Sequence, residues 1–312
     1  MSEIINREID FLALESTARG EVSISALRGG TFTLPKKLFV SGASDNEYSL
    51  VPSLSFLIIH QSPKAGQRRI LFDLGLRRDT DTYTPQIQNH LRNRLPMKSL
   101  PDVRASLLKG SLEPSAIDEV ILSHIHWDHV GTPLDFPQAR FFVGAGSLGL
   151  LKDGFGGHMS HSNFQNDMFD NLNVSEFPSP ETPNSGWRVV GGLNILGLTS
   201  DGSLYIVDSP GHLTGHIALM ARRGSRRWVL LIGDACHDTR LLTGEMPIAE
   251  WIDAEGRSCC IHMDKKKATE TLAKFSRWKQ AAEECGIELQ IVFAHDVEWA
   301  ESNAQAFFPG TF

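Results

Sequence analysis

Nine consecutive residues read Ser123-His124-Ile125-His126-Trp127-Asp128-His129-Val130-Gly131, and they carry the strongest signal in the chain. Three histidines and one aspartate fall within six residues, directly after the apolar run 120–122. Because side chains alternate along a strand, His124 and His126 are expected on one side of it. A turn near Trp127 would bring Asp128 and His129 towards a second point nearby. Imidazole and carboxylate are the ligands that zinc and similar ions prefer, so the stretch predicts a two-metal site.

The stretch resembles the H-x-H-x-D-H signature of the metallo-β-lactamase-fold hydrolases, and later elements of that family follow in order. Residues 209–216 are similar to its metal-ligand loop, 231–234 to its strand ending in a bridging aspartate, and 292–296 to its last ligand strand. The resemblance covers about residues 54–296. It implies an α+β fold, the αββα sandwich.

The same resemblance implies which side chains hold two divalent ions, with zinc as the expected metal. One ion is expected on His124, His126 and His212, the other on Asp128, His129 and His295, and Asp234 is expected to bridge both. His216 competes with His212, but Pro210 and Gly211 permit the tight turn that would present His212. Asp73 is similar to an aspartate that orients a ligand histidine in the family, and a turn-capping role explains it almost as well.

Within the family, the motif spacing and the ending 293–298 are most similar to the N-acyl-homoserine-lactone lactonases, whose relatives open small cyclic esters and amides. This implies a dinuclear lactonase or lactamase that uses a metal-bridging hydroxide, with Asp128 moving the proton. His237 stands three residues after Asp234, where some lactonases have a tyrosine. It is either a donor to the developing oxyanion or a bystander.

Two other functions remain open at this stage. A thioesterase that cleaves an acyl-thioester of the acyl-carrier-protein or glutathione type would use the same fold and metals. It would need a basic mouth for a phosphate or a carrier protein, and we cannot locate one in the sequence. A metal-binding scaffold without catalysis is disfavoured, because all seven ligand positions are filled.

The amino-acid composition indicates what kind of protein this is and which partners it is expected to have. The 312 residues include 41% hydrophobic and 21% charged ones, as is typical of a globular protein. A net charge of −7 and a pI of about 5.9 argue against nucleic-acid binding, so the expected partner is a small-molecule substrate, with a homodimer left open. No apolar run reaches the roughly 18 residues of a membrane span. Four cysteines are too few for a disulfide framework, which favours a cytoplasmic protein.

The rest of the pattern predicts one domain over residues 1–312, built from two strand-rich halves. Strands are expected over 22–26, 54–60, 69–73, 120–123, 140–143, 193–198, 204–207, 217–221, 228–232 and 289–293, and helical segments within 85–109, at 115–119 and over 265–285. Arg28-Gly29-Gly30 is interpreted as a turn, and residues 222–227 as a solvated basic loop. Residues 144–192 are interpreted as a lid-like insertion, or as surface loops with one helix. Together with the loop after Asp73, they are expected to wall the pocket.

Overall fold

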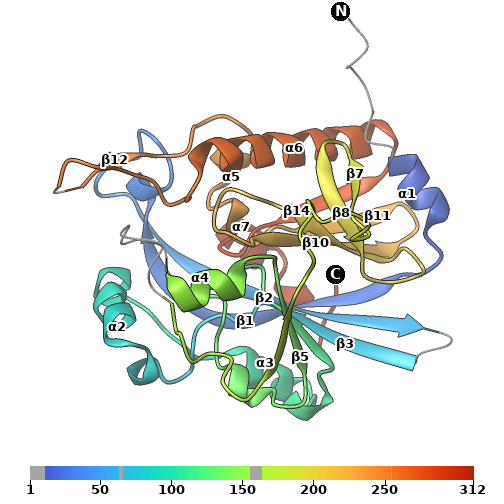
Figure 1. Ribbon diagram of the computed structural model, residues 1–312, viewed down its shortest axis with the longest axis horizontal. Coiled ribbons are helices and arrows are strands. Elements are labelled where there is room, and N and C mark those ends of the chain that lie inside the picture. The colour runs from blue at the N-terminus through green and yellow to red at the C-terminus, as the bar shows by residue number, and fades with distance from the viewer. Residues whose placement is uncertain (1–10, 63–65, 155–163, 254) are drawn as a thin grey trace, which may run out of the picture.

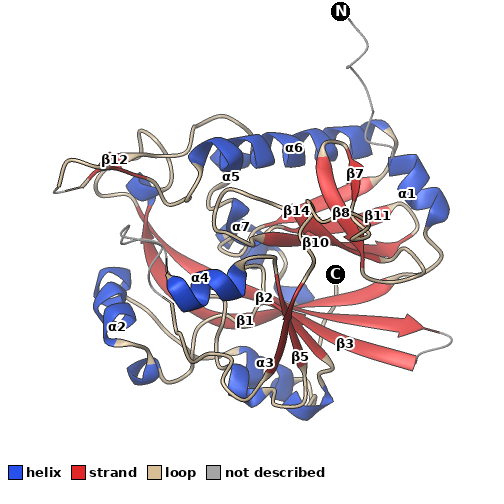
Figure 2. Ribbon diagram, in the orientation of Figure 1, coloured by secondary structure: helices blue, strands red, loops and turns tan. Residues whose placement is uncertain are grey.

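Two six-stranded sheets form the centre of the computed structural model, which describes residues 11–62, 66–154, 164–253 and 255–312. The first sheet has the strand order β1-β2-β3-β4-β5-β6, and the second has the order β14-β11-β10-β9-β8-β7. The sheets face each other, and helices lie on their outer sides (Figure 1; Figure 2). This confirms the predicted sandwich. Within the described ranges, no helix has both the length and the apolar character needed to cross a bilayer.

The first sheet combines antiparallel and parallel pairing. Its strands are β1 (Val22–Pro35), β2 (Tyr48–Ser62), β3 (Gly66–Phe72), β4 (Glu119–Ile121), β5 (Arg140–Val143) and β6 (Asn173–Glu176). The first three pair antiparallel, and β3 to β6 pair parallel. In the register, Phe72 lies opposite Ile121 at the ends of β3 and β4. The residues that follow these two strands, from Asp73 and from Leu122 onward, therefore leave the sheet at the same edge.

The glycines Gly29 and Gly30 do not form the expected turn. β1 continues through them as a bulge, where the register with β2 shifts between Arg28 and Thr31. A Cβ on Gly29 would lie 2.5 Å from the Ser53 carbonyl oxygen and 2.8 Å from the Cα of Gly75. Close backbone packing therefore requires glycine here, a use that a sequence cannot distinguish from a turn.

The second sheet is buried on both faces along its central strands. Its strands are β7 (Arg188–Val190), β8 (Leu193–Gly197), β9 (Leu204–Asp208), β10 (Ile217–Gly224), β11 (Arg227–Leu231) and β14 (Glu288–Val292). Val229 and Leu231 belong to the core between the sheets, whereas Trp228 and Leu230 pack in the core beneath helix α6 (Lys265–Glu284). This two-sided burial explains why the strand reads as a continuous apolar run. Helix α6 agrees closely with the predicted helix.

The basic segment after β10 is a tight turn and not a six-residue solvated loop. The strands extend to Gly224 and Arg227, so only residues 225–226 connect them. Arg222 Nη2 lies 2.8 Å from Oε1 of Glu15 on helix α1 (Phe11–Thr17), and Trp228 Nε1 donates to the same carboxylate at 2.9 Å. The hydrogen bond from Arg222 holds the pKa of Glu15 at about 2. These charges therefore fasten α1 to the second sheet.

The remaining helices and strands are short. They are α2 (Pro85–Leu91), α3 (Val103–Lys109), α4 (Ser147–Asp153), α5 (Thr239–Leu242), α7 (Val297–Ser302) and a two-stranded ribbon of β12 (Trp251–Ile252) and β13 (Ser258–Cys259). Val103 and Leu107 of α3 pack on the outer face of the first sheet. The described part of the segment 144–192 contains one α-helix, α4, in agreement with the interpretation as surface loops with one helix. It also contains the edge strands β6 and β7, which the sequence did not reveal, and so it connects the two sheets.

Candidate metal centre

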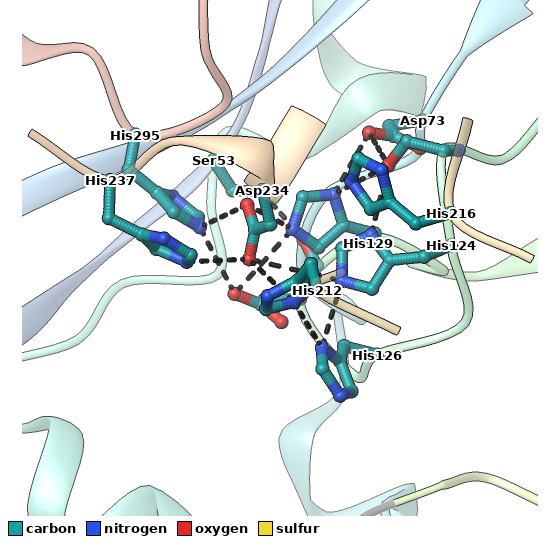
Figure 3. A network of polar contacts seen from close by, with 12 residues as sticks. Ser53, Asp73, His124, His126, His129, His212, His216, Asp234, His237 and His295 are labelled. Atoms are coloured by element: carbon teal, nitrogen blue, oxygen red, sulfur yellow. Dashed lines mark hydrogen bonds and ion pairs between the residues drawn. The ribbon is translucent and has the colours of Figure 1, made fainter. Parts of the chain in front are cut away.

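All seven predicted ligands come together at one edge of the sandwich. The first four lie in the segment after β4, His212 lies between β9 and β10, Asp234 lies after β11, and His295 follows β14. Figure 3 labels six of the seven and shows them converging, with Asp234 at the centre. Each is buried. The structure therefore brings the seven residues together where strands end, and their role as metal ligands stays a prediction.

The ligand atoms form two groups that share one carboxylate. The first cluster consists of His124, His126, His212 and Asp234, and the second consists of Asp128, His129, His295 and Asp234. Within each cluster, one nitrogen or oxygen atom per residue lies within 4.8 Å of all the others. These are groups able to hold metal ions, with the membership that the resemblance implied.

Neighbouring groups fix which ring nitrogen faces each cluster. His129 Nδ1 lies 2.9 Å from Asp73 Oδ2, and His295 Nδ1 donates to the Pro52 carbonyl oxygen at 2.8 Å. In both rings the Nε2 atom is then the one turned to the second cluster. His129 Nε2 lies 3.1 Å from Asp234 Oδ1, and both atoms belong to the second cluster.

Asp73 has the orienting position that the family resemblance suggested. Besides His129, it accepts hydrogen bonds from the Ser123 backbone nitrogen at 2.7 Å and from Ser123 Oγ at 2.8 Å. Its φ of 61° is in the left-handed region, which aspartate tolerates better than most residues. The carboxylate thus ties the end of β3 to the start of the histidine motif.

Charge is distributed unequally between the clusters. Burial, reinforced by neighbouring histidines, lowers the pKa of His124 and of His212 well below 6.5, so both rings are neutral. Burial alone would also lower the pKa of His129 and His295. The nearby carboxylates, Asp234 foremost, outweigh it and raise the pKa of His129 well above 6.5 and that of His295 to about 9. The second cluster therefore attracts positive charge more strongly.

His212, and not His216, belongs to the first cluster. His212 Nε2 lies 3.0 Å from His126 Nδ1 and 3.6 Å from Asp234 Oδ2. His216 Nδ1 instead lies 2.8 Å from Ser209 Oγ, and its ring packs 5.1 Å from that of His124. Gly211 has φ 130°, and a Cβ there would lie 2.2 Å from the Ala268 nitrogen. The turn that presents His212 therefore requires glycine.

His262 is a buried histidine of the site whose role the sequence did not reveal. Its Nδ1 lies 3.2 Å from His212 Nδ1. Because one of the two facing nitrogens must carry the hydrogen, His262 as acceptor leaves the Nε2 lone pair of His212 for the first cluster. It lies between β13 and α6, 50 residues from His212. No spacing rule connects two positions so far apart.

His237 and Cys236 lie beside the shared carboxylate. His237 Nε2 is 3.1 Å from Asp234 Oδ2, and its ring stacks on His295 with centroids 5.8 Å apart. Cys236 Sγ instead donates to the Asp238 carbonyl oxygen, and burial raises the pKa of this thiol to about 12. The cysteine is a small buried group. The histidine faces the cavity.

A cavity of about 960 Å³ opens over both clusters. Its walls come from the end of β1, from residues 90–95, from residues 250–253 and from residues 257–265. The described part of 144–192 and the loop after Asp73 do not line it, which corrects the prediction. The loop after Asp73 packs against Gly29, and α4 packs on the first sheet. Phe164 stacks on His126 at 5.9 Å, and His158 and His161 lie outside the described residues.

The sandwich and its paired histidine–aspartate clusters define a class of metal-dependent hydrolase. Residues 49–235 match the model of the metallo-beta-lactamase superfamily, and the chain belongs to that family of hydrolases, as predicted.

Particular relatives are fungal proteins. The chain is 30% identical over 198 residues to the metallo-hydrolase mfmC of Annulohypoxylon moriforme. The aligned residues make up 61% of this chain and 50% of that protein. The cytochrome P450 monooxygenase mpaDE' of Penicillium brevicompactum is 30% identical over 198 residues, 61% of this chain and 22% of that protein. The gamma-lactamase FDB1 of Fusarium pseudograminearum is 27% identical over 197 residues, with 59% and 45% covered. The chain thus matches half or less of the length of these relatives.

Solved structures show the same fold at lower identity. A quorum-quenching N-acyl homoserine lactone lactonase superimposes with a TM-score of 0.65 at 18% identity, covering 95% of this chain and all of the other. The dizinc quorum-quenching lactonase AidC gives a TM-score of 0.57 at 17% identity, with 88% of each chain covered.

Proposed function

We propose that this chain is a dinuclear metal-dependent hydrolase that opens a small cyclic ester or cyclic amide. The observation that carries the proposal is the shared buried Asp234, on which two complete ligand groups meet. A carboxylate common to two clusters supports a pair of ions acting on one substrate bond. The likeness to a gamma-lactamase and to lactonase structures supports the choice of substrate.

The donor atoms fit zinc, because they are imidazole nitrogens and carboxylate oxygens whose orientation is fixed by Asp73, Pro52 and His262. His124, His126 and His212 would hold one ion, and Asp128, His129 and His295 the other, with Asp234 between them. When bound, the pair supplies an acidified water as nucleophile and a positive charge that polarises the substrate carbonyl.

Asp128 is the group that moves the proton. It lines the cavity, and its Oδ2 lies 3.4 Å from His295 Nε2. From this position a carboxylate takes a proton from the attacking water and passes it to the leaving alkoxide or amide. The proposal therefore gives Asp128 two tasks, ligation and proton transfer.

His237 is proposed to donate a hydrogen bond to the developing oxyanion. It faces the cavity beside Asp234, and its Nδ1 is buried without a hydrogen bond. We expect His237→Ala to lower kcat by about 10²–10³-fold with metal content unchanged. His237→Tyr should restore part of the loss. If metal is lost in parallel with kcat, His237 positions Asp234 instead.

The test is metal analysis of the purified chain, followed by assays with lactones, lactams and acyl-thioesters. We expect about two zinc ions per chain and ring opening of a lactone or a lactam. Cleavage of thioesters alone would favour the thioesterase function, and inertness of the metal-loaded chain towards all three classes would overturn the proposal.

A further inference from the structure

Arg94 is a buried cation in the wall of the cavity. It ends a 3-10 helix formed by Arg92–Arg94, exposes 6% of its surface and lines the cavity. Its side chain makes one long hydrogen bond, 3.4 Å from Nη1 to the Asn93 carbonyl oxygen. Across the part of the chain that the structure describes, no carboxylate forms an ion pair with it.

Other cations of the same wall are neutralised by partners. Lys37 pairs with Asp45 at 3.0 Å, Arg257 with Asp253 at 2.7 Å, and Lys265 with Glu250 at 2.5 Å. Arg92 is exposed to water. Arg94 therefore combines burial with the absence of an ion-paired carboxylate, an arrangement that costs stability unless a ligand compensates it.

The backbone around Arg94 is fixed in place. Thr33 Oγ1 on β1 donates to the Pro96 carbonyl oxygen at 3.0 Å. Thr31 and Lys98 exchange two backbone hydrogen bonds of 2.8 Å each. The backbone just after Arg94 is thus held against β1, so the loss of backbone entropy when a ligand binds is small.

Arg94 lies on the side of the second cluster. His90, one helical turn earlier, packs edge-on against Trp127 with centroids 5.8 Å apart. Burial lowers the pKa of both Arg94 and His90, and the charge of Asp128 opposes this in each. The carboxylate of Asp128 is therefore the acidic group within electrostatic reach of Arg94, and it is already engaged with His295.

We propose that Arg94 binds a carboxylate carried by the substrate, next to the ring that the metal clusters open. This inference rests on the proposed function and names its substrate class. A guanidinium matches a carboxylate with two parallel N–H···O bonds. Phe32, Leu34 and Trp127 line the same cavity with apolar surface. The expected substrate is therefore a lactone or lactam that has an apolar body and a free carboxylate.

The test compares phthalide with a carboxyphthalide, two lactones that differ by one carboxylate, on the zinc-loaded full chain. We expect the wild type to favour the acid in kcat/KM by at least about tenfold, and Arg94→Gln to lower kcat/KM for the acid by about 10- to 100-fold. The ratio of the two substrates should fall to about one. Arg104→Gln is the matched control, because it removes an exposed arginine on α3 and should leave the ratio unchanged.

Equal turnover of both lactones by the wild type, or a preference that survives in Arg94→Gln, would overturn the role of Arg94 and leave the proposed function standing. If the wild type opens neither lactone, benzoate and benzamide serve as probes in thermal unfolding. Benzoate that stabilises the wild type but not Arg94→Gln would support the carboxylate site, whatever the assays with other lactones and lactams decide about the proposed function. Equal shifts would overturn the carboxylate site and leave the proposed function to those assays.

A stability measurement separates binding from a structural role. Arg94→Met removes an unpaired buried charge, so we expect its Tm without ligand to equal or exceed that of the wild type. A clear fall in Tm would mean that Arg94 supports the fold and would overturn the inference.

Discussion

The two ligand clusters share Asp234 but differ in charge and in what supports them. The first has three imidazoles around that carboxylate, and His262 stands behind one of them. The second has a further carboxylate, Asp128, and Asp73 stands behind its His129. One shared residue can therefore serve two electrostatic environments, one with a single carboxylate among neutral imidazoles and one with two carboxylates that favour protonated or metal-bound imidazoles.

The largest effect is expected from a substitution of Asp234, the residue that both clusters share. We expect Asp234→Ala to reduce the metal content of both clusters and to lower kcat/KM by at least about 10³-fold, because several kcal/mol of charge stabilisation are lost. Elemental analysis and steady-state assays measure this. Full metal content and activity in the variant would disprove the bridging role.

Substitution of a ligand that belongs to one cluster alone should remove metal from that cluster preferentially. His124→Ala should lose the ion of the first cluster preferentially, and His129→Ala that of the second, since each ring belongs to one group alone. Titration of the metal-free variants with zinc should then show one site where the wild type shows two. Simultaneous loss of both ions in each variant would mean that the clusters fill only as a unit.

Smaller effects are expected from the residues behind the ligands. Asp73→Asn should weaken zinc binding at the second cluster, and His262→Ala at the first, each by about 10- to 100-fold. Asparagine keeps a hydrogen-bonding side chain and tolerates the φ of 61° at position 73, so the fold should persist. Competition with a chelator gives the affinities. A reversed pattern would contradict the assignment of each support to its cluster.

The smallest effect should come from a charge remote from both clusters. Glu15→Gln should destabilise the fold by about 2 kcal/mol at neutral pH, because hydrogen bonds to an ionised group are lost, while zinc affinity stays unchanged.

The pH dependence of that effect has a defined sign. The pKa of Glu15 is about 2 in the folded chain against an ordinary 4.5. Its contribution is therefore complete above pH 4.5 and is lost as the pH falls towards 2. Urea unfolding of wild type and variant between neutral and acidic pH should show the difference shrinking. A constant difference would mean that the charge of Glu15 is not its cause.

The positions of the seven candidate ligands were predictable from the sequence because the family resemblance and local strand order agree on them. β4 and β11 end three residues before His124 and Asp234, so each side chain lies at the sheet edge. Long apolar runs such as 228–232 predict buried strands for a similar reason. The strands and the fold class could therefore be predicted from short windows.

Residues whose role depends on distant backbone were missed. Gly29 is required by the approach of Gly75, and His262 matters because α6 brings it to His212. The cavity wall was misassigned for the same reason. Residues 250–265 carry ordinary polar and aromatic side chains, and only tertiary packing places them over the clusters. Arg94 resembles any arginine until its burial and lack of a partner are known.

The ribbon of β12 and β13 belongs to neither sheet of the sandwich. It contributes Trp251, Ser258 and Cys259 to the cavity, but none of the seven clustered ligands comes from it. Mutations there can alter which molecules enter while the ligand geometry is preserved. Natural selection, or a laboratory library confined to residues 250–260, can therefore change the substrates that fit the cavity while the seven clustered residues stay unchanged.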